Sequence, residues 1–255
     1  MTDQTLRSRI SIVTGGTRGI GRAIVRALLQ AGSNVVATYA HDASSAEETR
    51  SEFIRAGLPG DRFLIVRSDV SKRKDVKELL KTSCAAWGGP VSLLVNNAGI
   101  LRQGDFFDLT EKQWDQTFAT NLKGPFLLCQ EAMPIMTETK DPSIVNIASI
   151  GGQTGGPRAP DYAASKAALI CFTQSMARIG APMGIRVNAV SPGWIDTGIF
   201  TEQRLRELHE EARSAIPLQR LGKPEEVAET VVFLLSKKAS YITGHVLNVN
   251  GGMHF

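Results

Sequence analysis

Short apolar runs alternate with longer helical patterns along almost the whole sequence. Most of the runs are continuous in Val, Ile and Leu without polar alternation, which is typical of strands covered on both faces. The predicted strands are Ile10–Val13, Asn34–Thr38, Arg62–Arg67, Val91–Val95, Ser143–Ser149, Ile185–Val190 and His245–Val249. The predicted helices lie near residues 20–31, 44–56, 72–87, 111–137, 161–180 and 224–236. This order predicts an α/β fold: a doubly wound, seven-stranded parallel sheet with helices on both faces and right-handed crossovers.

No proline-rich linker, change of composition or internal repeat divides the sequence, so we expect a single domain over residues 1–255. The least regular part runs from Trp194 to Ala215. There a Pro-Gly turn is followed by a helical segment, Glu202–Arg213, with charges around its whole circumference. Such a helix is too polar for a core, and we interpret residues 194–215 as a lid over a site.

Composition narrows the possible classes. Of the 255 residues, 42% are hydrophobic, which is enough for the core of one large α/β domain. The formal charge is +4, but Lys and Arg are scattered among Asp and Glu without a basic run that interleaves aromatics. Nucleic-acid binding is therefore a weak hypothesis. No apolar run approaches the ~18 residues of a membrane helix, and the first ten residues contain no apolar signal core.

Cysteine and histidine usage indicates a reducing compartment and no metal. Cys84, Cys129 and Cys171 are few, odd in number and embedded in helical patterns, so we interpret them as buried free thiols. The four histidines are far apart and lack the spacing of metal ligands. We expect a cytoplasmic, metal-free protein.

A glycine-rich segment follows the first predicted strand directly. The sequence TGGTRGIG, Thr14 to Gly21, places Gly15, Gly19 and Gly21 where a strand gives way to a helix. Spaced glycines there permit a tight turn and close approach of a pyrophosphate, which the helix N-terminus favours. Three glycines in a turn also occur for backbone reasons alone, but the strand–turn–helix context favours dinucleotide binding.

This spacing resembles the fingerprint of the short-chain dehydrogenase/reductase (SDR) family, a family of single-domain Rossmann folds, and the resemblance extends to the end of the chain. Further segments match in the family's order: NNAG (96–99), ATNLKGPF (119–126), NIASI (146–150), YAASK (162–166), RVNAVSPGWIDT (186–197) and YITGHVLNVNGG (241–252). One departure is Asn250, where many members have Asp. No single segment is specific, but together they are.

The resemblance favours NADP(H) over NAD(H). NAD-using members usually end the second strand in an acidic residue that binds the ribose 2′-hydroxyl, but Tyr39 stands there, followed by Ala40 and His41. Arg18 resembles the basic residue of NADP-preferring members, and a guanidinium suits phosphate. The alternative, which we favour less, is that Arg18 is a solvated loop charge. Tyr39 and His41 either stack near the adenine or lie on the surface.

Other cofactor contacts are implied by resemblance only. Asp69 and Val70, at the end of the third strand, look like the family's adenine-side pair, and Asp69 is also a candidate helix N-cap. The implied cofactor-binding residues are Gly15, Thr17, Arg18, Gly19, Ile20, Gly21, Tyr39, Asp69, Val70, Asn97, Ala98, Gly99, Tyr162, Lys166, Pro192, Gly193, Ile195 and Thr197.

The candidate catalytic residues are Asn121, Ser149, Tyr162 and Lys166. Four positions make about one helical turn, so Tyr162 and Lys166 share a helix face, where the ammonium would hold down the phenol pKa. Hydride transfer to a carbonyl needs a proton donor, and we assign that role to Tyr162. Ser149 would donate to the substrate oxygen. The resemblance implies that Lys166 also binds the nicotinamide ribose and that Asn121 holds a water of a proton relay.

The sequence says least about the substrate. The closest resemblance is to the 3-oxoacyl-[acyl-carrier-protein] reductase branch, but Met183 stands where a basic docking residue is usual, while Lys140 could fill the other basic position. Arg158 either meets an anionic group or is solvated. We expect a 3-oxoacyl thioester, free or carrier-protein-bound, or a related ketone. The alternatives are a free ketone or secondary alcohol of secondary metabolism, or a catalytically silent NADP(H)-binding sensor. By analogy alone we expect a homotetramer.

Overall fold

One parallel sheet forms the centre of the molecule. The computed structural model describes residues 5–198 and 202–255, and these contain a seven-stranded sheet. Its strands are β1 (Ile10–Val13), β2 (Asn34–Tyr39), β3 (Phe63–Arg67), β4 (Leu93–Asn96), β5 (Ser143–Ile147), β6 (Arg186–Pro192) and β7 (Val246–Val249). Their order is β3-β2-β1-β4-β5-β6-β7, and every neighbouring pair is parallel. The doubly wound parallel sheet predicted from the apolar runs is confirmed.

Burial explains why the runs lack polar alternation. Every residue of the central strands β1, β4 and β5 is buried, whereas no residue of the edge strands β3 and β7 is. A strand covered on both faces has no position for a solvated side chain, so its sequence is apolar throughout. The fifth strand ends at Ile147, two residues earlier than predicted, and leaves Ser149 in the connection beyond it.

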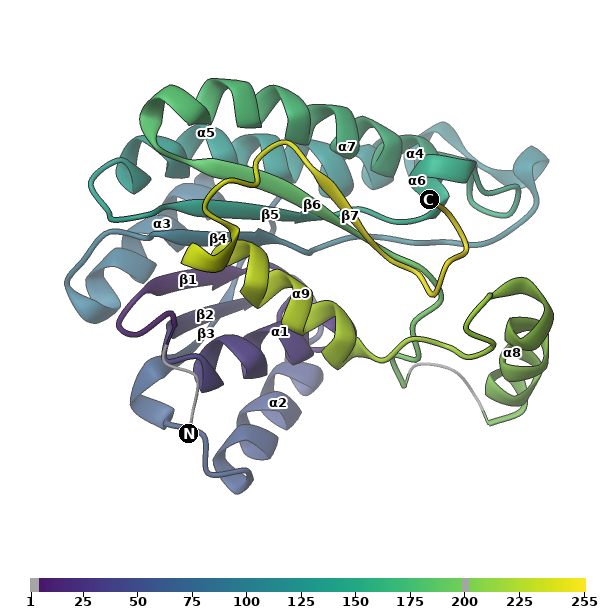
Figure 1. Ribbon diagram of the computed structural model, residues 1–255, viewed down its shortest axis with the longest axis horizontal. Helices are drawn as coiled ribbons and strands as arrows, with labels where there is room; N and C mark the ends of the chain where they lie inside the picture. Colours follow the sequence, from purple (N-terminus) through teal and green to yellow (C-terminus); the bar gives the residue numbers. More distant parts are fainter. Residues whose placement is uncertain (1–4, 199–201) are drawn as a thin grey trace.

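Helices cover both faces of the sheet (Figure 1). The α-helices of the described residues are α1 (Gly19–Gln30), α2 (Ala43–Arg55), α3 (Arg73–Trp87), α4 (Glu111–Phe118), α5 (Gly124–Met136), α6 (Gly151–Thr154), α7 (Pro160–Gly180), α8 (Glu202–Ala215) and α9 (Pro224–Leu235), and α8 lies outside the two layers. On one face α1 and α9 pack together, and Leu28 and Leu234 are fully buried in that core. On the other face lie α3, α5 and α7, whose core includes Leu79 and Leu128.

A π-helical turn divides the long helix predicted between the fourth and fifth strands. Helix α4 ends at Phe118, the turn occupies Ala119–Lys123, and α5 begins at Gly124. A side chain at Gly124 would lie 2.8 Å from a methyl carbon of Val70, so glycine permits the close approach of α5 to the segment that follows β3. Single π-turns inside α-helices are frequent at functional sites, and this one contains Asn121.

The strand order reverses between β1 and β4. From β1 the chain winds outward through β2 to β3, then returns to β4 on the other side and continues to β7. In open α/β sheets the crevice for a ligand lies at the carboxyl ends of the strands beside such a switch point. The glycine-rich segment follows β1, and the NNAG segment follows β4, so both lie at this place.

Helix α8 stands apart from the two layers (Figure 1). It extends over Glu202–Ala215, two residues beyond the predicted helix. A small cluster of its own anchors it: the buried members are Leu208, Ala212, Ile216 and Leu221, with Trp194 and Met253 packed against them. Ile199 and Phe200, which belong to the predicted lid, lie outside the described residues.

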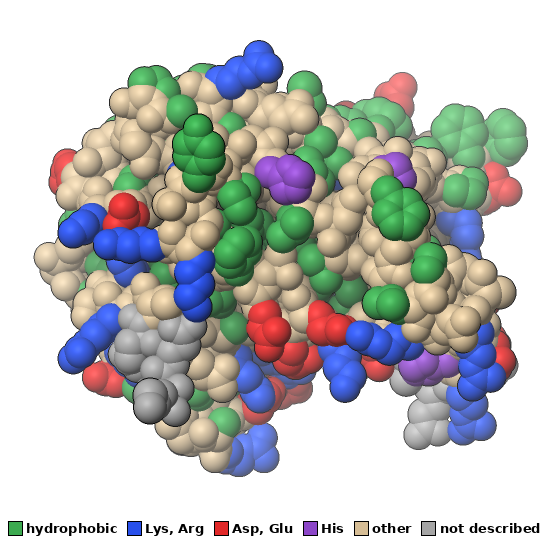
Figure 2. Space-filling view, viewed as in Figure 1, with side chains coloured by type: hydrophobic (Ala, Val, Ile, Leu, Met, Phe, Trp, Pro, Cys, Tyr) green, Lys and Arg blue, Asp and Glu red, His purple; other side chains and the backbone are tan. Residues whose placement is uncertain are grey.

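The structure corrects one expectation about the thiols. Cys129 is buried and Cys84 is partly buried, but Cys171 on α7 is exposed, so the prediction of three buried cysteines is wrong for that residue. In the described parts of the chain no helix is long and apolar enough to cross a membrane, and no His, Cys, Asp and Glu side chains gather as a metal site. Basic and acidic side chains are interspersed on the face shown in Figure 2.

Candidate active site

Three separate elements bring the four predicted catalytic residues together. Asn121 lies in the π-turn, Ser149 lies two residues after β5, and Tyr162 and Lys166 lie one turn apart on α7. Asn121 is completely buried and Lys166 is 3% exposed. The predicted constellation therefore forms at the carboxyl end of the sheet, beneath the surface of the crevice.

Lys166 is fixed between the sheet and the phenol ring. Its ammonium nitrogen donates a 2.6 Å hydrogen bond to the carbonyl oxygen of Ile147, the last residue of β5. The same nitrogen lies 5.7 Å from the centre of the Tyr162 ring. A strand end thus holds the ammonium beside the phenol, as the four-residue spacing predicts.

Burial dominates the protonation equilibria of this pair. It raises the pKa of Tyr162 above its ordinary value, and a hydrogen bond with Ser149 works in the opposite direction. Burial also lowers the pKa of Lys166 to about 8. Both shifts have the same cause, because a dry site disfavours phenolate and ammonium alike. Desolvation therefore sets the direction of the Tyr162 pKa shift, and the expected lowering of the phenol pKa by the Lys166 ammonium stays a prediction.

Ser149 is oriented by the backbone that follows it. Its hydroxyl oxygen accepts a hydrogen bond from the N–H of Gly151 at 3.1 Å, and the same side chain is hydrogen-bonded to Tyr162. Gly151 opens the short helix α6, which was not predicted. The backbone N–H uses only one lone pair of the Ser149 oxygen. The hydroxyl proton of Ser149 can therefore still be donated to the phenol or to a substrate oxygen.

Asn121 clamps the segment that follows β4. Its Oδ1 accepts a hydrogen bond from the N–H of Ile100 at 2.8 Å, and its Nδ2 donates to the carbonyl oxygen of Ile100 at 3.0 Å. The second Nδ2 proton goes to the hydroxyl of Ser165 at 3.0 Å, and Ser165 donates in turn to the carbonyl oxygen of Tyr162 at 2.7 Å. Ser165 thus connects the π-turn to the catalytic helix. Sequence reasoning treated it only as a spacer between Tyr162 and Lys166.

The glycine-rich loop has the backbone geometry that was expected. Gly15 and Gly19 both have positive φ, +63° and +50°, which favours glycine. A side chain on Gly21 would lie 2.1 Å from the carbonyl oxygen of Gly15, so the helix can pack this closely only with glycine there. Among the described residues no side chain caps the N-terminus of α1, and its first turn has no acidic residue. Its free N–H groups fit an anionic ligand.

Asn97 and Gly99 join this loop to the catalytic residues. Asn97 donates from Nδ2 to the carbonyl oxygens of Thr14 at 2.8 Å and Gly15 at 3.0 Å, so it pins the loop. A side chain on Gly99 would lie 3.5 Å from Oδ1 of Asn121 and 3.6 Å from the ammonium of Lys166. The absence of a side chain leaves room for a ligand between the loop and the catalytic pair.

The region after β2 contains an acidic residue that sequence reasoning did not consider. Tyr39 ends β2 and is half-buried, and Arg18 is exposed. Three positions after Tyr39, Asp42 caps α2 and accepts a 3.0 Å hydrogen bond from the N–H of Ser45. Hydrogen bonds from Ser45 lower the pKa of Asp42, and the charge of Arg18 contributes to the same shift. A carboxylate therefore shares the electrostatic environment of Arg18.

One interpretation expected Asp69 to be the N-cap of a helix, and the structure shows that this is wrong. The residue before α3 is Lys72, which occupies the N-cap position. Asp69 instead accepts hydrogen bonds from the N–H and hydroxyl of Ser71 at 3.1 and 2.7 Å, and pairs with the ammonium of Lys72 at 3.2 Å. These contacts form a local turn that places Asp69 and Val70 at the end of β3.

The segment after β6 lies against the glycine-rich loop. A side chain on Gly193 would lie 2.8 Å from Cα of Asn250, so the turn packs tightly on the C-terminal strand's end. Ile195 pairs with Gly222 in an isolated bridge. A side chain on Gly19 would lie 3.3 Å from Cβ of Thr197. The predicted nicotinamide-side residues and the predicted phosphate loop are therefore neighbours.

Comparisons with known proteins agree with this arrangement. A family model described as enoyl-(acyl carrier protein) reductase matches residues 15–254. The 3-oxoacyl-[acyl-carrier-protein] reductase FabG of Staphylococcus aureus strain Mu50 is 40% identical over 247 residues, which cover 97% of this chain and 98% of that protein. This chain belongs to the short-chain dehydrogenase/reductase family.

Other relatives of this SDR chain carry different names. FabG of Thermotoga maritima is 38% identical over 252 residues, 97% of this chain and 98% of its own length. Among solved structures, an SDR from Brucella melitensis titled glucose/ribitol dehydrogenase superposes with a TM-score of 0.89 at 34% identity, covering 98% of both chains. A putative short-chain alcohol dehydrogenase from Sinorhizobium meliloti gives the same values. The family and its oxidoreductase chemistry with a nicotinamide cofactor are thus shown, while the relatives' names differ in substrate.

Proposed function

We propose that this chain is an NADP(H)-dependent reductase that converts the carbonyl of a 3-oxoacyl thioester, or of a related ketone, to a secondary alcohol. One observation carries the proposal. The Tyr162 phenol is half-buried, hydrogen-bonded to Ser149 and flanked by the Lys166 ammonium, in the crevice beside an uncapped helix N-terminus.

The residues of the chain divide the proton chemistry between them. The cofactor, when bound, supplies the hydride. Ser149 donates a hydrogen bond to the substrate oxygen and orients it, and Tyr162 gives that oxygen its proton as negative charge develops. The raised pKa of Tyr162 keeps the phenol protonated, which suits an acid in the reducing direction. Lys166 stabilises the phenolate that remains and binds the nicotinamide ribose.

Asn121 supports the return of a proton to Tyr162. Both of its Nδ2 protons already have protein acceptors, the carbonyl oxygen of Ile100 and the hydroxyl of Ser165. A relay water would therefore bind to an oxygen of Asn121, which remains an acceptor, and not to its amide nitrogen.

Cofactor choice rests on the surroundings of Arg18. The exposed Arg18 directly precedes Gly19 of the loop, and its charge acts on Asp42, which caps α2. A guanidinium forms charge-assisted hydrogen bonds with a phosphate, which supports NADP(H). Asp42 opposes the same phosphate through its charge, so we infer a moderate preference for NADP(H) over NAD(H).

The substrate class rests on the relatives. Those named FabG are 3-oxoacyl-[acyl-carrier-protein] reductases and match nearly the whole chain. Met183 and Lys140 stand at the two positions where basic docking residues were expected, so only one of the two is basic. We therefore propose a thioester or ketone substrate for which a carrier protein is not essential, with residues 194–215 as the lid over it.

We also propose a homotetramer, in which α4, α5 and α7 of neighbouring copies pack together. Two large apolar side chains on these helices support it, because Trp114 is 38% and Phe126 is 40% exposed. The molar mass in solution, measured by light scattering, tests this proposal: a monomer at micromolar concentration would contradict it.

Loss of absorbance at 340 nm tests the activity. The purified chain is mixed with NADPH or NADH and with acetoacetyl thioesters on coenzyme A, on a carrier protein and on a short pantetheine, and with simple ketones. Turnover with NADPH and a thioester supports the proposal. Binding of NADPH without turnover of any carbonyl compound favours the silent sensor instead, and failure to bind either nucleotide contradicts both.

A further inference from the structure

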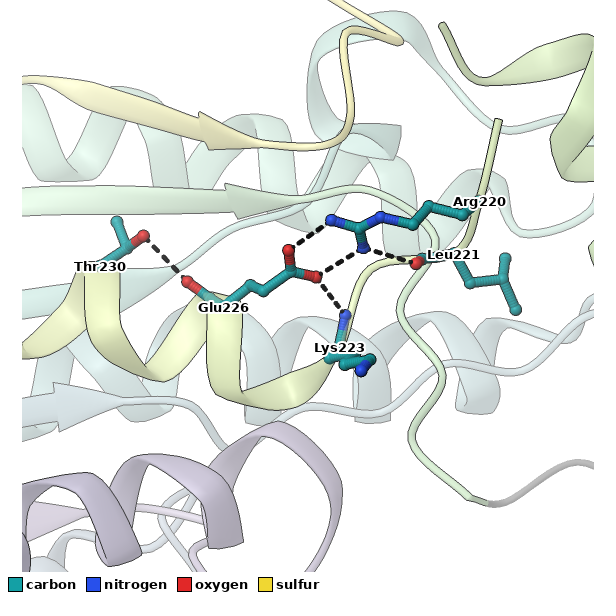
Figure 3. Close-up of polar contacts among 5 residues, drawn as sticks. All are labelled: Arg220, Leu221, Lys223, Glu226 and Thr230. Carbon is teal, nitrogen blue, oxygen red and sulfur yellow. Dashed lines mark hydrogen bonds and ion pairs between the residues drawn. The ribbon is translucent and has the colours of Figure 1, made fainter. Parts of the chain in front are cut away.

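An ion pair between Arg220 and Glu226 joins the segment that follows α8 to the first turn of α9 (Figure 3). The guanidinium donates from Nη2 to Oε1 at 2.6 Å and from Nη1 to Oε2 at 2.9 Å, so the contact has two parallel hydrogen bonds. Oε2 also accepts from the N–H of Lys223 at 2.8 Å, which caps α9. Nη1 also donates to the carbonyl oxygen of Leu221 at 3.0 Å. This network fixes residues 220–223 to the first turn of α9.

The fixed segment holds the chain that leaves β6. Gly222 donates from its N–H to the carbonyl oxygen of Trp194, and its own carbonyl oxygen accepts from the N–H of Asp196, both at 2.9 Å. Between them Ile195 and Gly222 form a parallel bridge. A side chain at Gly222 would lie 2.6 Å from Cδ1 of Ile195, so these two segments of the chain pack closely because residue 222 is glycine. The position of residues 194–196 thus depends on that of Gly222.

The same segment continues to the glycine-rich loop. Thr197 follows directly, and its Cβ lies 3.3 Å from where a side chain on Gly19 would be. A continuous path of contacts therefore runs from the Arg220–Glu226 pair through Gly222 and Ile195 to the wall of the cofactor crevice. Neither charged residue belongs to the predicted site.

We propose that Arg220 and Glu226 are a positioning pair that sets NADP(H) affinity by fixing residues 194–197 beside the glycine-rich loop. This inference rests on the proposed function and on Ile195 and Thr197 being among the cofactor-binding residues that the family resemblance implies. The pair acts before any chemical step, because it contacts neither Tyr162 nor Ser149. Its hydrogen bonds from Arg220 also lower the pKa of Glu226 to about 2, so the pair stays charged at every pH at which the enzyme is assayed.

Two single variants and their combination test the pair. Arg220→Met removes the charge and both hydrogen bonds to the carboxylate. Glu226→Gln removes the charge but keeps an amide oxygen that can accept from the N–H of Lys223, so the α9 cap survives. Because an exposed ion pair contributes only a small free energy, we expect the Kd of NADPH to rise about three- to fivefold in each variant. We expect kcat at saturating NADPH to stay unchanged. We also expect the double variant to bind NADPH no more weakly than either single variant.

Lys237→Met provides the matched control. Lys237 pairs with Asp141 at 3.4 Å, and this exposed ion pair also joins two separate segments, but at the amino-terminal edge of the sheet. Nucleotide fluorescence gives Kd without any need for turnover, and steady-state kinetics give KM and kcat separately. Circular dichroism establishes that each variant is folded, and Glu226→Gln carries the test if Arg220→Met does not fold.

Different outcomes contradict different statements. If wild-type protein binds neither NADPH nor NADH, the proposed function fails. If wild-type protein binds NADPH but both variants bind it equally well, the positioning role of the pair is wrong while the function stands. The role is also wrong if Lys237→Met weakens binding as much, because the effect would then be general destabilisation. A fall in kcat at unchanged Kd would likewise overturn it.

Discussion

The ammonium of Lys166 and the carbonyl oxygen of Ile147 lie 2.6 Å apart, so the last residue of a central strand fixes the cation of the candidate site. This contact links the sheet to helix α7 at the position where we propose that the chemistry takes place. It also means that an ammonium group is held in a dry environment by the carbonyl oxygen of Ile147, which makes its protonation sensitive to pH.

The buried ammonium should make the stability of the protein without cofactor depend on pH. The pKa of Lys166 is about 8 in the folded protein and 10.5 in its ordinary state, so the unfolded chain binds more protons between these values. The free energy of unfolding therefore rises with pH in this window, and the cost of the charge is fully present below pH 8. Between pH 8 and 9.5 the gain should be about 2 kcal/mol.

Urea denaturation at several pH values measures this gain, and Lys166→Met is the reference because it removes the titrating group and keeps a chain of similar length. The slope of stability against pH should be shallower in Lys166→Met by the amount given above. Measurements stop at pH 9.5, below the midpoint of tyrosine titration. Parallel curves for the two proteins would show that Lys166 does not titrate in this window.

Tyr162→Phe should remove turnover and leave the nucleotide site intact. The substitution deletes only the phenol oxygen, and loss of a general acid lowers the rate by about 10²–10⁴-fold. The Kd of NADPH, measured by fluorescence, should stay at the wild-type value, since the ring still fills its place. If the variant reduces a ketone at the wild-type rate, another group supplies the proton.

Arg18 and Asp42 should act on NADPH affinity in opposite directions. Arg18→Ala removes charge-assisted hydrogen bonds to the 2′-phosphate. It should weaken the binding of NADPH about tenfold without weakening the binding of NADH. Asp42→Asn keeps a side chain that caps α2 but removes its charge, so it should strengthen NADPH binding, and the gain should shrink as salt is added. Equal effects of Arg18→Ala on both nucleotides would show that Arg18 does not bind the phosphate.

Continuous apolar runs located all seven strands because a central parallel strand has no solvated face. The same kind of pattern failed inside the long helix after β4. An α-helix and a π-turn present similar apolar positions over one turn, so periodicity did not separate Ala119–Lys123 from its neighbours. Helix α6 was also missed, since its sequence begins with two glycines, which indicate a loop.

Local spacing placed Tyr162 and Lys166 on one helix face, but contacts between distant residues escaped it. Asn121 and Ser165 are 44 positions apart, and nothing in either segment shows that they meet. The environment of a titrating group is also a property of packing: burial, and not the adjacent cation, fixes the direction of the Tyr162 pKa shift. Motifs therefore identified the candidate reacting groups, whereas the groups that hold them became visible only in the fold.

Ser165→Ala tests the most specific of these supporting contacts. The substitution leaves an Nδ2 proton of buried Asn121 without its acceptor and releases the carbonyl oxygen of Tyr162 from its hydroxyl partner. We expect a loss of about 1–3 kcal/mol in the free energy of unfolding, because an unsatisfied buried donor keeps its desolvation penalty. We also expect a lower kcat at an unchanged Kd of NADPH, since the catalytic helix loses its link to the π-turn. Ser175→Ala on the same helix is the control, because the Ser175 hydroxyl is exposed and bonds only to the carbonyl oxygen of Cys171 within its own helix. If both variants lose stability and kcat alike, the effect belongs to serine in this helix and not to the bridge to Asn121.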